Sequence, residues 1–172
     1  YKPLINLSGF CFTTNLYICK MSTILDPYIL KLNSIEKELP KIAEQAVVEN
    51  IENIKNILKY SQLELGINSD GDDVGTYSSL TEEYASIADT VKPKIAGDSF
   101  NFQWSGATFA FMDIATDGKG NYDIFSTSGK QKLLEDIYGE LFDLTDEHNQ
   151  YVNMELILPS LINYILDNLV QI

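Results

Sequence analysis

The chain has 172 residues, a length typical of one domain that can bury a substantial core. It carries 25 acidic residues and only 12 basic ones, all of them lysine, which gives a net charge of -13. Without arginine, an acidic chain lacks the side chain that binds phosphate in a bidentate way. The composition therefore argues against nucleic-acid binding and against attachment to anionic membranes.

Residues 1–20 differ in composition from the rest of the chain. They contain no acidic residue, they carry both cysteines, Cys11 and Cys19, and they end just before Met21. Polar residues interrupt the apolar run that a signal peptide requires. We therefore expect residues 1–20 to be an upstream extension or an arm that packs on a neighbour, followed by a single domain over 21–172. The two cysteines do not have the pattern of a zinc site, and we expect reduced thiols and no metal or cofactor.

The segment from Asp26 to Leu65 has a helical pattern. Asp26 and Pro27 resemble a helix start, and Pro40 is expected to divide a short first helix from a longer second one. Apolar residues in the second helix recur every three or four positions, so they form one buried stripe: Val47, Ile51, Ile54 and Leu58.

The next segment is polar and invites comparison with a calcium loop, because Asn68, Asp70 and Asp72 alternate. The loop would need Gly where this chain has Asp73, and Glu where it has Ser79. We therefore expect an exposed polar turn, followed by a short helix capped by a serine or threonine.

Aromatic and polar residues alternate at the centre of the chain, and this alternation predicts a strand that contains Phe100, Phe102 and Trp104. The parity of the aromatic residues changes after Gly106, as at a bulge or tight bend. Asp117 and Gly118 then predict a hairpin turn, and residues 122–126 predict the returning strand. Everything else has a helical pattern, so the predicted fold class is α+β: a small antiparallel hairpin packed against long N-terminal and C-terminal helices.

The last third of the chain is predicted to be helical. Serines at positions 126 and 128 are available as caps, Gly139 is a candidate C-cap, and Thr145 is a candidate N-cap. Pro159 is expected to kink or restart the final helix. The single histidine, His148, lies near no recognisable nucleophile motif, so a role at the surface or in a helix cap is favoured and no enzymatic activity is expected.

Several short motifs occur together in one order. They are Tyr77-Ser78, Leu80-Thr81, Trp104-Ser105-Gly106 with Phe109, Tyr122-Asp123-Ile124-Phe125-Ser126, Lys132-Leu133-Leu134, Tyr138-Gly139, Leu144-Thr145-Asp146-Glu147 and Pro159. This ordered set, over residues 21–169, resembles the small virion-morphogenesis or tail-completion proteins of tailed bacteriophages, including phages of Bacteroides-type hosts. Two features depart from the family pattern: Trp104 stands where its acidic turn residue is expected, and few lysines precede the first predicted strand.

The resemblance implies a structural protomer of the virion neck or tail, like a head-tail connector or tail terminator. Such a protomer forms a homo-oligomeric ring, contacts the portal, a stopper or the tail tube, and assembles in the cytoplasm of the bacterial host. The expected interface residues are Trp104, Ser105, Gly106, Phe109, Phe111, Tyr122 and Phe125. The alternative is a small soluble binding module of a bacterial cell that uses the aromatic hairpin as its ligand face.

Overall fold

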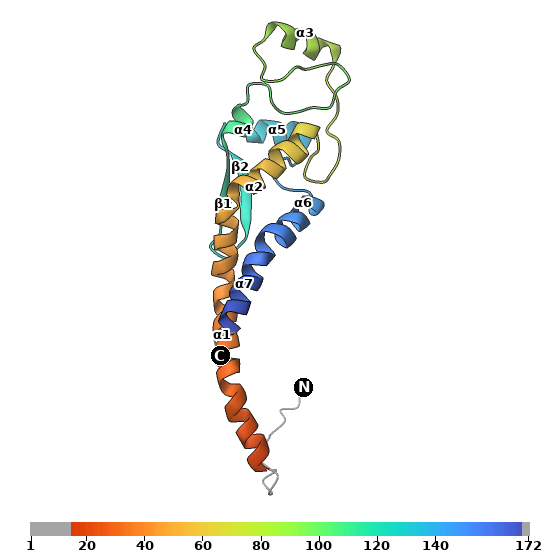
Figure 1. The fold of residues 1–172 in the computed structure, drawn as a ribbon. Helices are drawn as coiled ribbons and strands as arrows, with labels where there is room; N and C mark the ends of the chain where they lie inside the picture. Colours follow the sequence, from red (N-terminus) through yellow and green to blue (C-terminus); the bar gives the residue numbers. More distant parts are fainter. Residues whose placement is uncertain (1–14, 170–172) are drawn as a thin grey trace, which may run out of the picture.

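The computed structural model describes residues 15–169, and side-chain surroundings from residue 25 onward. The fold is α+β: two long helical segments pack on each other, and one two-stranded antiparallel sheet lies against them (Figure 1). This agrees with the predicted fold class. The arm expected over residues 1–20 lies outside the described residues, apart from its last six, 15–20, which are helical.

Helix α1, Asn15–Glu49, passes without interruption through Pro27 and Pro40. The helix start predicted at Asp26 and the break predicted at Pro40 are therefore wrong. A proline inside a helix removes one backbone hydrogen bond and crowds the preceding turn, at a cost of about 3 kcal/mol. The helix continues because it is anchored on both sides of Pro40: Ile35 is buried before it, and Ala46 and Val47 are buried after it.

The chain continues through α2, Ile51–Asn56, a π-helical segment η1, Ile57–Gln62, and a 3-10 turn η2, Leu63–Leu65. The predicted apolar stripe is confirmed, because Val47, Ile54 and Leu58 are fully buried. Gly66 ends this helical segment in a left-handed conformation, with φ of 76°. A Cβ atom at Gly66 would lie 2.6 Å from the carbonyl oxygen of Phe100, so only glycine allows the later loop to approach this closely.

The sheet consists of β1, Met112–Thr116, and β2, Tyr122–Ser126, which pair antiparallel with Ile114 opposite Ile124. The predicted turn is confirmed: the backbone N–H of Asp117 donates to the carbonyl of Asn121 at 3.2 Å. The hairpin tip lies against α1, where Glu44 accepts hydrogen bonds from the Thr116 hydroxyl and from the backbone N–H of Gly120.

The strand predicted from Phe100 to Trp104 is wrong. These residues form an irregular loop, and Phe102 has a left-handed φ of 48°. The short helix α4, Ala107–Ala110, follows it, with Gly106 as N-cap at φ of 72°. The aromatic alternation arises because the loop directs rings into a pocket, described below, instead of onto the face of a sheet.

The C-terminal half contains α5, Gln131–Tyr138, then α6, Asp146–Tyr151, a π-helical segment η3, Val152–Ile157, and α7, Leu158–Leu169. Gly139 is the C-cap of α5, and the Thr145 hydroxyl caps α6 by accepting the backbone N–H of His148, as predicted. At the start of α5 the N-cap is Lys130, without a side-chain capping bond, so the expected serine cap is wrong. The π-helical turn directly before Pro159 fits the irregularity expected at that proline.

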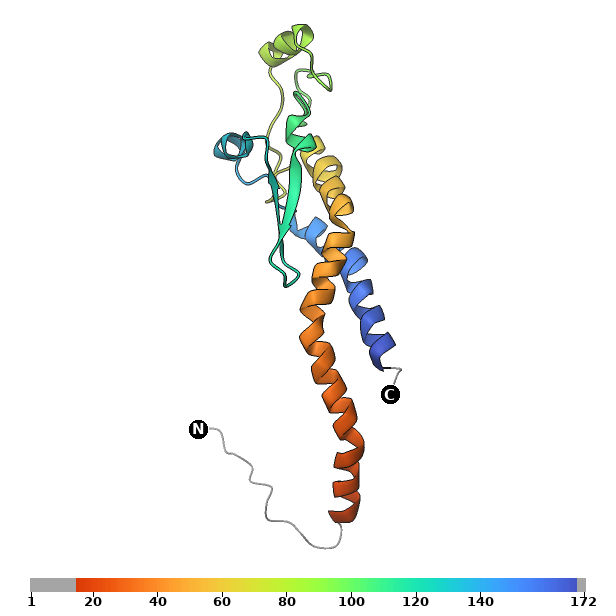
Figure 2. The ribbon, with the colours of Figure 1, turned by 90° about the vertical axis from the view of Figure 1, so that its left-hand side faces the viewer.

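The core lies where α1, α2 and η1 meet the hairpin and the segment from Leu141 to Ile157. Helix α3, Ser79–Ile87, with Ser78 as its N-cap, lies at one end of an elongated molecule (Figure 1). The N-terminal half of α1 extends at the other end, past the last turn of α7 (Figure 2). The two ends therefore offer separate surfaces.

Candidate functional site

The structure places the predicted interface residues in different surroundings. Trp104 and Ser105 line a pocket near the α3 end of the molecule, and Gly106 forms the turn beside them. Trp104 is 41% exposed, so its ring is available to solvent. Of these three adjacent residues, Trp104 and Ser105 therefore lie at a concave surface.

The other predicted residues lie elsewhere. Phe109 is buried in the core, where its ring meets that of Tyr60 edge to face, with centroids 6.3 Å apart. Phe111 is exposed, at 55%. On β2, Tyr122 and Phe125 are half-buried, and the Tyr122 hydroxyl donates to Asn149 Oδ1 at 3.0 Å. The structure thus separates these four residues from the pocket that contains Trp104.

We call this cavity of about 390 Å³ the aromatic pocket. Its walls are five aromatic rings, those of Tyr77, Phe100, Phe102, Trp104 and Tyr138. Two lysines, Lys94 and Lys130, also line it, together with small polar side chains and Leu134. Its volume falls in the range of small-molecule sites, roughly 300–1,000 Å³.

The rings hold one another in edge-to-face and tilted arrangements. Phe100 packs edge to face on Tyr77, with centroids 4.7 Å apart, and lies 5.3 Å from Tyr138. Phe102 meets Tyr138 edge to face at 5.4 Å. Aromatic pairs at these separations contribute about 0.5–1.5 kcal/mol each beyond the area they bury. The pocket wall is therefore a preformed aromatic surface that joins a loop to α5.

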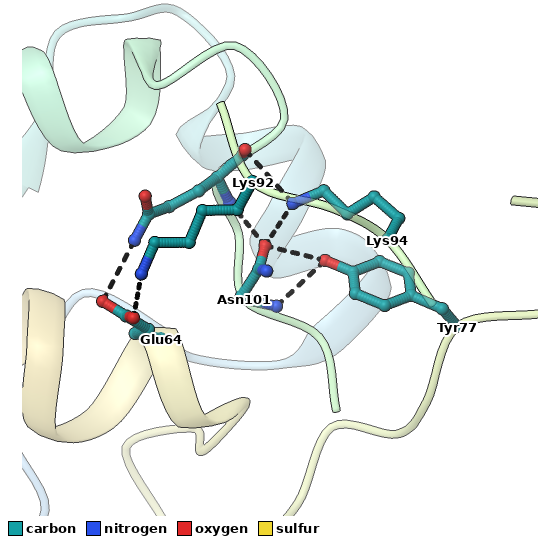
Figure 3. Close-up of polar contacts among 6 residues, drawn as sticks. Glu64, Tyr77, Lys92, Lys94 and Asn101 are labelled. Carbon is teal, nitrogen blue, oxygen red and sulfur yellow. Dashed lines mark hydrogen bonds and ion pairs between the residues drawn. The ribbon is translucent and has the colours of Figure 1, made fainter. Parts of the chain in front are cut away.

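A polar network fixes the loop that carries Phe100, Phe102 and Trp104 (Figure 3). Asn101 Oδ1 accepts hydrogen bonds from the Tyr77 hydroxyl at 2.9 Å and from the Lys94 ammonium. The backbone N–H of Asn101 donates back to the Tyr77 hydroxyl at 3.0 Å. Glu64 joins the same loop to η2, because it pairs with Lys92 and accepts from the Gln103 amide at 3.2 Å. Side-chain hydrogen bonds and an ion pair thus hold this irregular loop, which lacks the backbone hydrogen bonds of a strand.

Lys94 is only 3% exposed and donates to the carbonyl of Gln103 at 3.2 Å. Its ammonium also lies 5.4 Å from the centre of the Tyr77 ring. Burial, and secondarily the positive charge of Lys92, lowers the pKa of Lys94. Burial also raises the pKa of Tyr77, because it disfavours the charged form of each group.

No sequence pattern predicted that these residues form a pocket. Tyr77 and Tyr138 were available as motif residues, and they now lie beside Trp104. No sequence pattern predicts that Lys94 is buried, because a lysine in a polar connector is ordinarily exposed.

His148 lies apart from the aromatic pocket and has a structural setting. Its Nδ1 atom is 3.2 Å from Gln62 Oε1, and Gln62 also accepts from the backbone N–H of Thr145 at 3.1 Å. The Gln62 amide donates to the carbonyl of Asp143 at 2.8 Å. This arrangement ties the start of α6 to η1. Over the described residues, no group of three or more His, Cys, Asp or Glu side chains is arranged to hold a metal ion.

A second candidate surface is apolar. We use the name helix-pair surface for two sets of exposed apolar residues, one on each of two packed helices: Leu25, Ile29 and Leu32 on α1, and Leu158, Ile162 and Leu166 on α7. On α1, residues 25–30 are all exposed, and Ile29 retains 51% of its accessible area. Spacings of three and four place each set along one face of its helix.

Comparisons with known proteins give no relative: no protein-family model, no curated protein and no solved structure matches the chain. Among the helices that the structure describes, none is both long enough and apolar enough to cross a membrane.

Proposed function

We propose that the protein is a structural protomer that assembles with copies of itself through the helix-pair surface. The observation that carries this proposal is that Leu25, Ile29 and Leu32 are about half exposed on α1, a helix whose N-terminal part projects past α7 (Figure 2). Soluble monomers rarely expose contiguous apolar patches of more than a few hundred Å² unless the patch is a binding site.

The energetics favour covering this surface. Full burial of a Leu or Ile side chain contributes about 1.5–3 kcal/mol. Leu25, Ile29 and Leu32 are 50%, 51% and 49% exposed, so covering all three contributes on the order of 3 kcal/mol per protomer. The face on α7 adds to this, since Ile162 and Leu166 are 44% and 53% exposed. Repeated around a closed ring, such contacts would stabilise an oligomer.

We assign this protomer to the neck or tail of a tailed-phage virion, as a head-tail connector or tail-completion ring component. Support comes from the ordered motifs in the sequence. Five of them supply residues to the aromatic pocket, namely Tyr77, Thr81, Trp104 with Ser105, Leu134 and Tyr138. An elongated shape with separate end surfaces suits a ring component that contacts itself and a neighbouring virion protein. The net charge of -13 suits a protein that lines a DNA conduit without adhering to the duplex.

Replacing the α1 part of the helix-pair surface tests the assembly proposal. The triple variant Leu25→Gln, Ile29→Gln and Leu32→Gln keeps good helix formers but removes the apolar face. We expect sedimentation equilibrium to report an oligomer for the natural chain and a monomer for the variant. The matched control is Asn33→Gln, Ser34→Gln and Lys37→Gln, which alters three exposed polar positions of the same helix and should leave the oligomer intact.

The virion assignment has its own test. Quantitative mass spectrometry of purified particles from the phage that encodes the chain should find it in a fixed copy number relative to the portal protein. Absence from mature particles would contradict the assignment but would leave self-assembly to be judged by the sedimentation result.

A further inference from the structure

The aromatic pocket concentrates positive charge on an acidic protein. The chain carries 25 acidic residues, yet among the residues that the structure describes no acidic side chain lines this pocket, whereas Lys94 and Lys130 do. Lys130 lies at the start of α5 and is exposed, while Lys94 is 3% exposed. The local charge is thus opposite to that of the whole molecule and favours an anionic ligand.

Lys94 has no counter-ion among the described residues. The ion pairs that the structure shows from residue 25 to 169 join other lysines to glutamates, namely Lys55 to Glu52 and Lys92 to Glu64. An ammonium has three donors, and the Lys94 bonds to Asn101 and Gln103 use two of them on uncharged oxygens. Burying a charge without a partner of opposite sign is costly, so an anion in the pocket would offset a cost that the free protein carries.

The aromatic lining of the pocket indicates which uncharged group the ligand carries. The rings of Phe100, Phe102 and Tyr138 form a continuous apolar wall, and Trp104 forms a partly exposed side. Aromatic walls of this kind favour a flat apolar group, which can pack edge to face or stacked against the rings. A cavity of about 390 Å³ accepts one ring system with a short acidic tail.

We infer that the aromatic pocket binds a small aromatic carboxylate, with its ring against Phe100, Phe102 and Tyr138 and its carboxylate toward the two lysines. This inference rests on the pocket alone, so it stands or falls separately from assembly through the helix-pair surface. It also differs from a hairpin ligand face, because the aromatic loop that lines the pocket is not part of the sheet.

The test compares 3-phenylpropionate with its uncharged isostere, 3-phenylpropionamide, on the full chain. Trp104 is the only tryptophan, so its fluorescence reports the pocket directly. We expect saturable binding of the acid and at least about tenfold weaker binding of the amide, a factor that corresponds to about 1.4 kcal/mol. Equal affinity for acid and amide, or no saturable change with either, would overturn the inference.

Two lysine variants locate the carboxylate. Lys130→Gln removes an exposed charge and should weaken binding of the acid about threefold, as for a solvent-exposed pair. Lys94→Met keeps the apolar stem and should abolish the preference for acid over amide. Lys119→Gln, in the hairpin turn, is the control and should bind like the natural chain. If Lys94→Met does not fold, the Lys130→Gln variant alone tests the position of the carboxylate. Unchanged binding of 3-phenylpropionate to Lys130→Gln would contradict the proposed orientation.

A third ligand distinguishes binding of a free small molecule from binding of a segment of another protein. The capped dipeptide acetyl-Phe-Glu-amide offers a ring and a carboxylate that belong to a protein. We expect it to bind more weakly than 3-phenylpropionate, because its backbone must fit the same cavity. Tighter binding of the dipeptide would overturn the small-molecule inference and mark the pocket as a docking site for an acidic segment of another protein.

Discussion

At the residue scale, a few polar side chains hold irregular backbone in place. Asn101 is the clearest case, because its Oδ1 atom accepts from the Tyr77 hydroxyl, the Lys94 ammonium and the backbone N–H of Gln103. One amide oxygen thereby stands in for the hydrogen-bond ladder that a strand would have supplied to this loop. The aromatic pocket depends on this group, although Asn101 is not among the residues that line it.

Asn101→Ala therefore should destabilise the protein more than a typical surface change. The substitution leaves the Tyr77 hydroxyl without its acceptor and removes one of the two acceptors of the Lys94 ammonium. An unsatisfied buried group costs about 1–3 kcal/mol. We expect urea unfolding to show a loss of about 2 kcal/mol or more. Asn56→Ala, at an exposed helical position, is the control and should change stability by less than about 0.5 kcal/mol. Equal effects of the two substitutions would contradict this role for Asn101.

Tyr122 makes stability depend on pH in the alkaline range. Burial, with a smaller contribution from the charge of Asp143, raises the pKa of its phenol from 10.0 to about 12. The folded state thus favours the neutral phenol, so this contribution is complete below about pH 10 and is lost as the pH rises toward 12.

The measurement is urea unfolding at about pH 9, 10 and 11. Between pH 10 and 11 the natural chain should lose about 1 kcal/mol more stability than Tyr122→Phe, which has no ionisable phenol at this position. Tyr151→Phe, at a side chain that is 51% exposed, should keep the pH dependence of the natural chain. If Tyr122→Phe loses stability with pH as steeply as the natural chain, the buried phenol is not the cause.

At the element scale, the hairpin is positioned by its turn. Gly120 has a φ of 96°, and a Cβ atom there would lie 2.6 Å from the Cβ of Ala43 on α1. Glu44, the next residue of α1, accepts the backbone N–H of Gly120 at 3.3 Å. The turn therefore touches the helix through its backbone, and this contact sets where the sheet lies along α1.

Gly120→Ala and Gly118→Ala form a matched pair that tests this contact. Both glycines have positive φ, 96° and 75°, but nothing lies within 4 Å of a Cβ atom at Gly118. Gly118→Ala should cost about 1 kcal/mol for the strained backbone alone. Gly120→Ala should cost at least about 1–3 kcal/mol more, because the turn must move off α1. Equal losses in thermal or urea unfolding would show that the turn does not pack on the helix as described.

The elements that depend on residues close together in the chain could be predicted from the sequence. The Asp117-Gly118 turn, the buried stripe through Ile54 and the Thr145 cap were all predictable, because each depends on residues close together in the chain. The break at Pro40 was predicted wrongly, since packing at Ile35 and Val47 outweighs the local cost of proline. The pocket lay beyond prediction, because its rings come from three separate segments and the backbone at Phe102 is left-handed.

At the scale of the whole molecule, the two ends differ in chemistry. The α3 end carries the aromatic pocket with its two lysines, whereas the other end presents the apolar helix-pair surface. The core between them joins α1, the hairpin and the C-terminal helices, and the Tyr164 hydroxyl donates to Glu38 at 2.7 Å across the helix pair. A protomer built this way can join copies of itself at one end and leave the other end free for a different ligand.

Native mass spectrometry of the natural full-length chain tests self-assembly most directly. The account predicts one discrete oligomer with a fixed number of subunits at micromolar concentration, because a closed set of helix-pair contacts leaves no free surface to continue growth. Hydrogen exchange at residues 25–32 should then be slower in the oligomer than in the glutamine triple variant. A chain that remains monomeric at every concentration, with fast exchange over residues 25–32, would contradict the account.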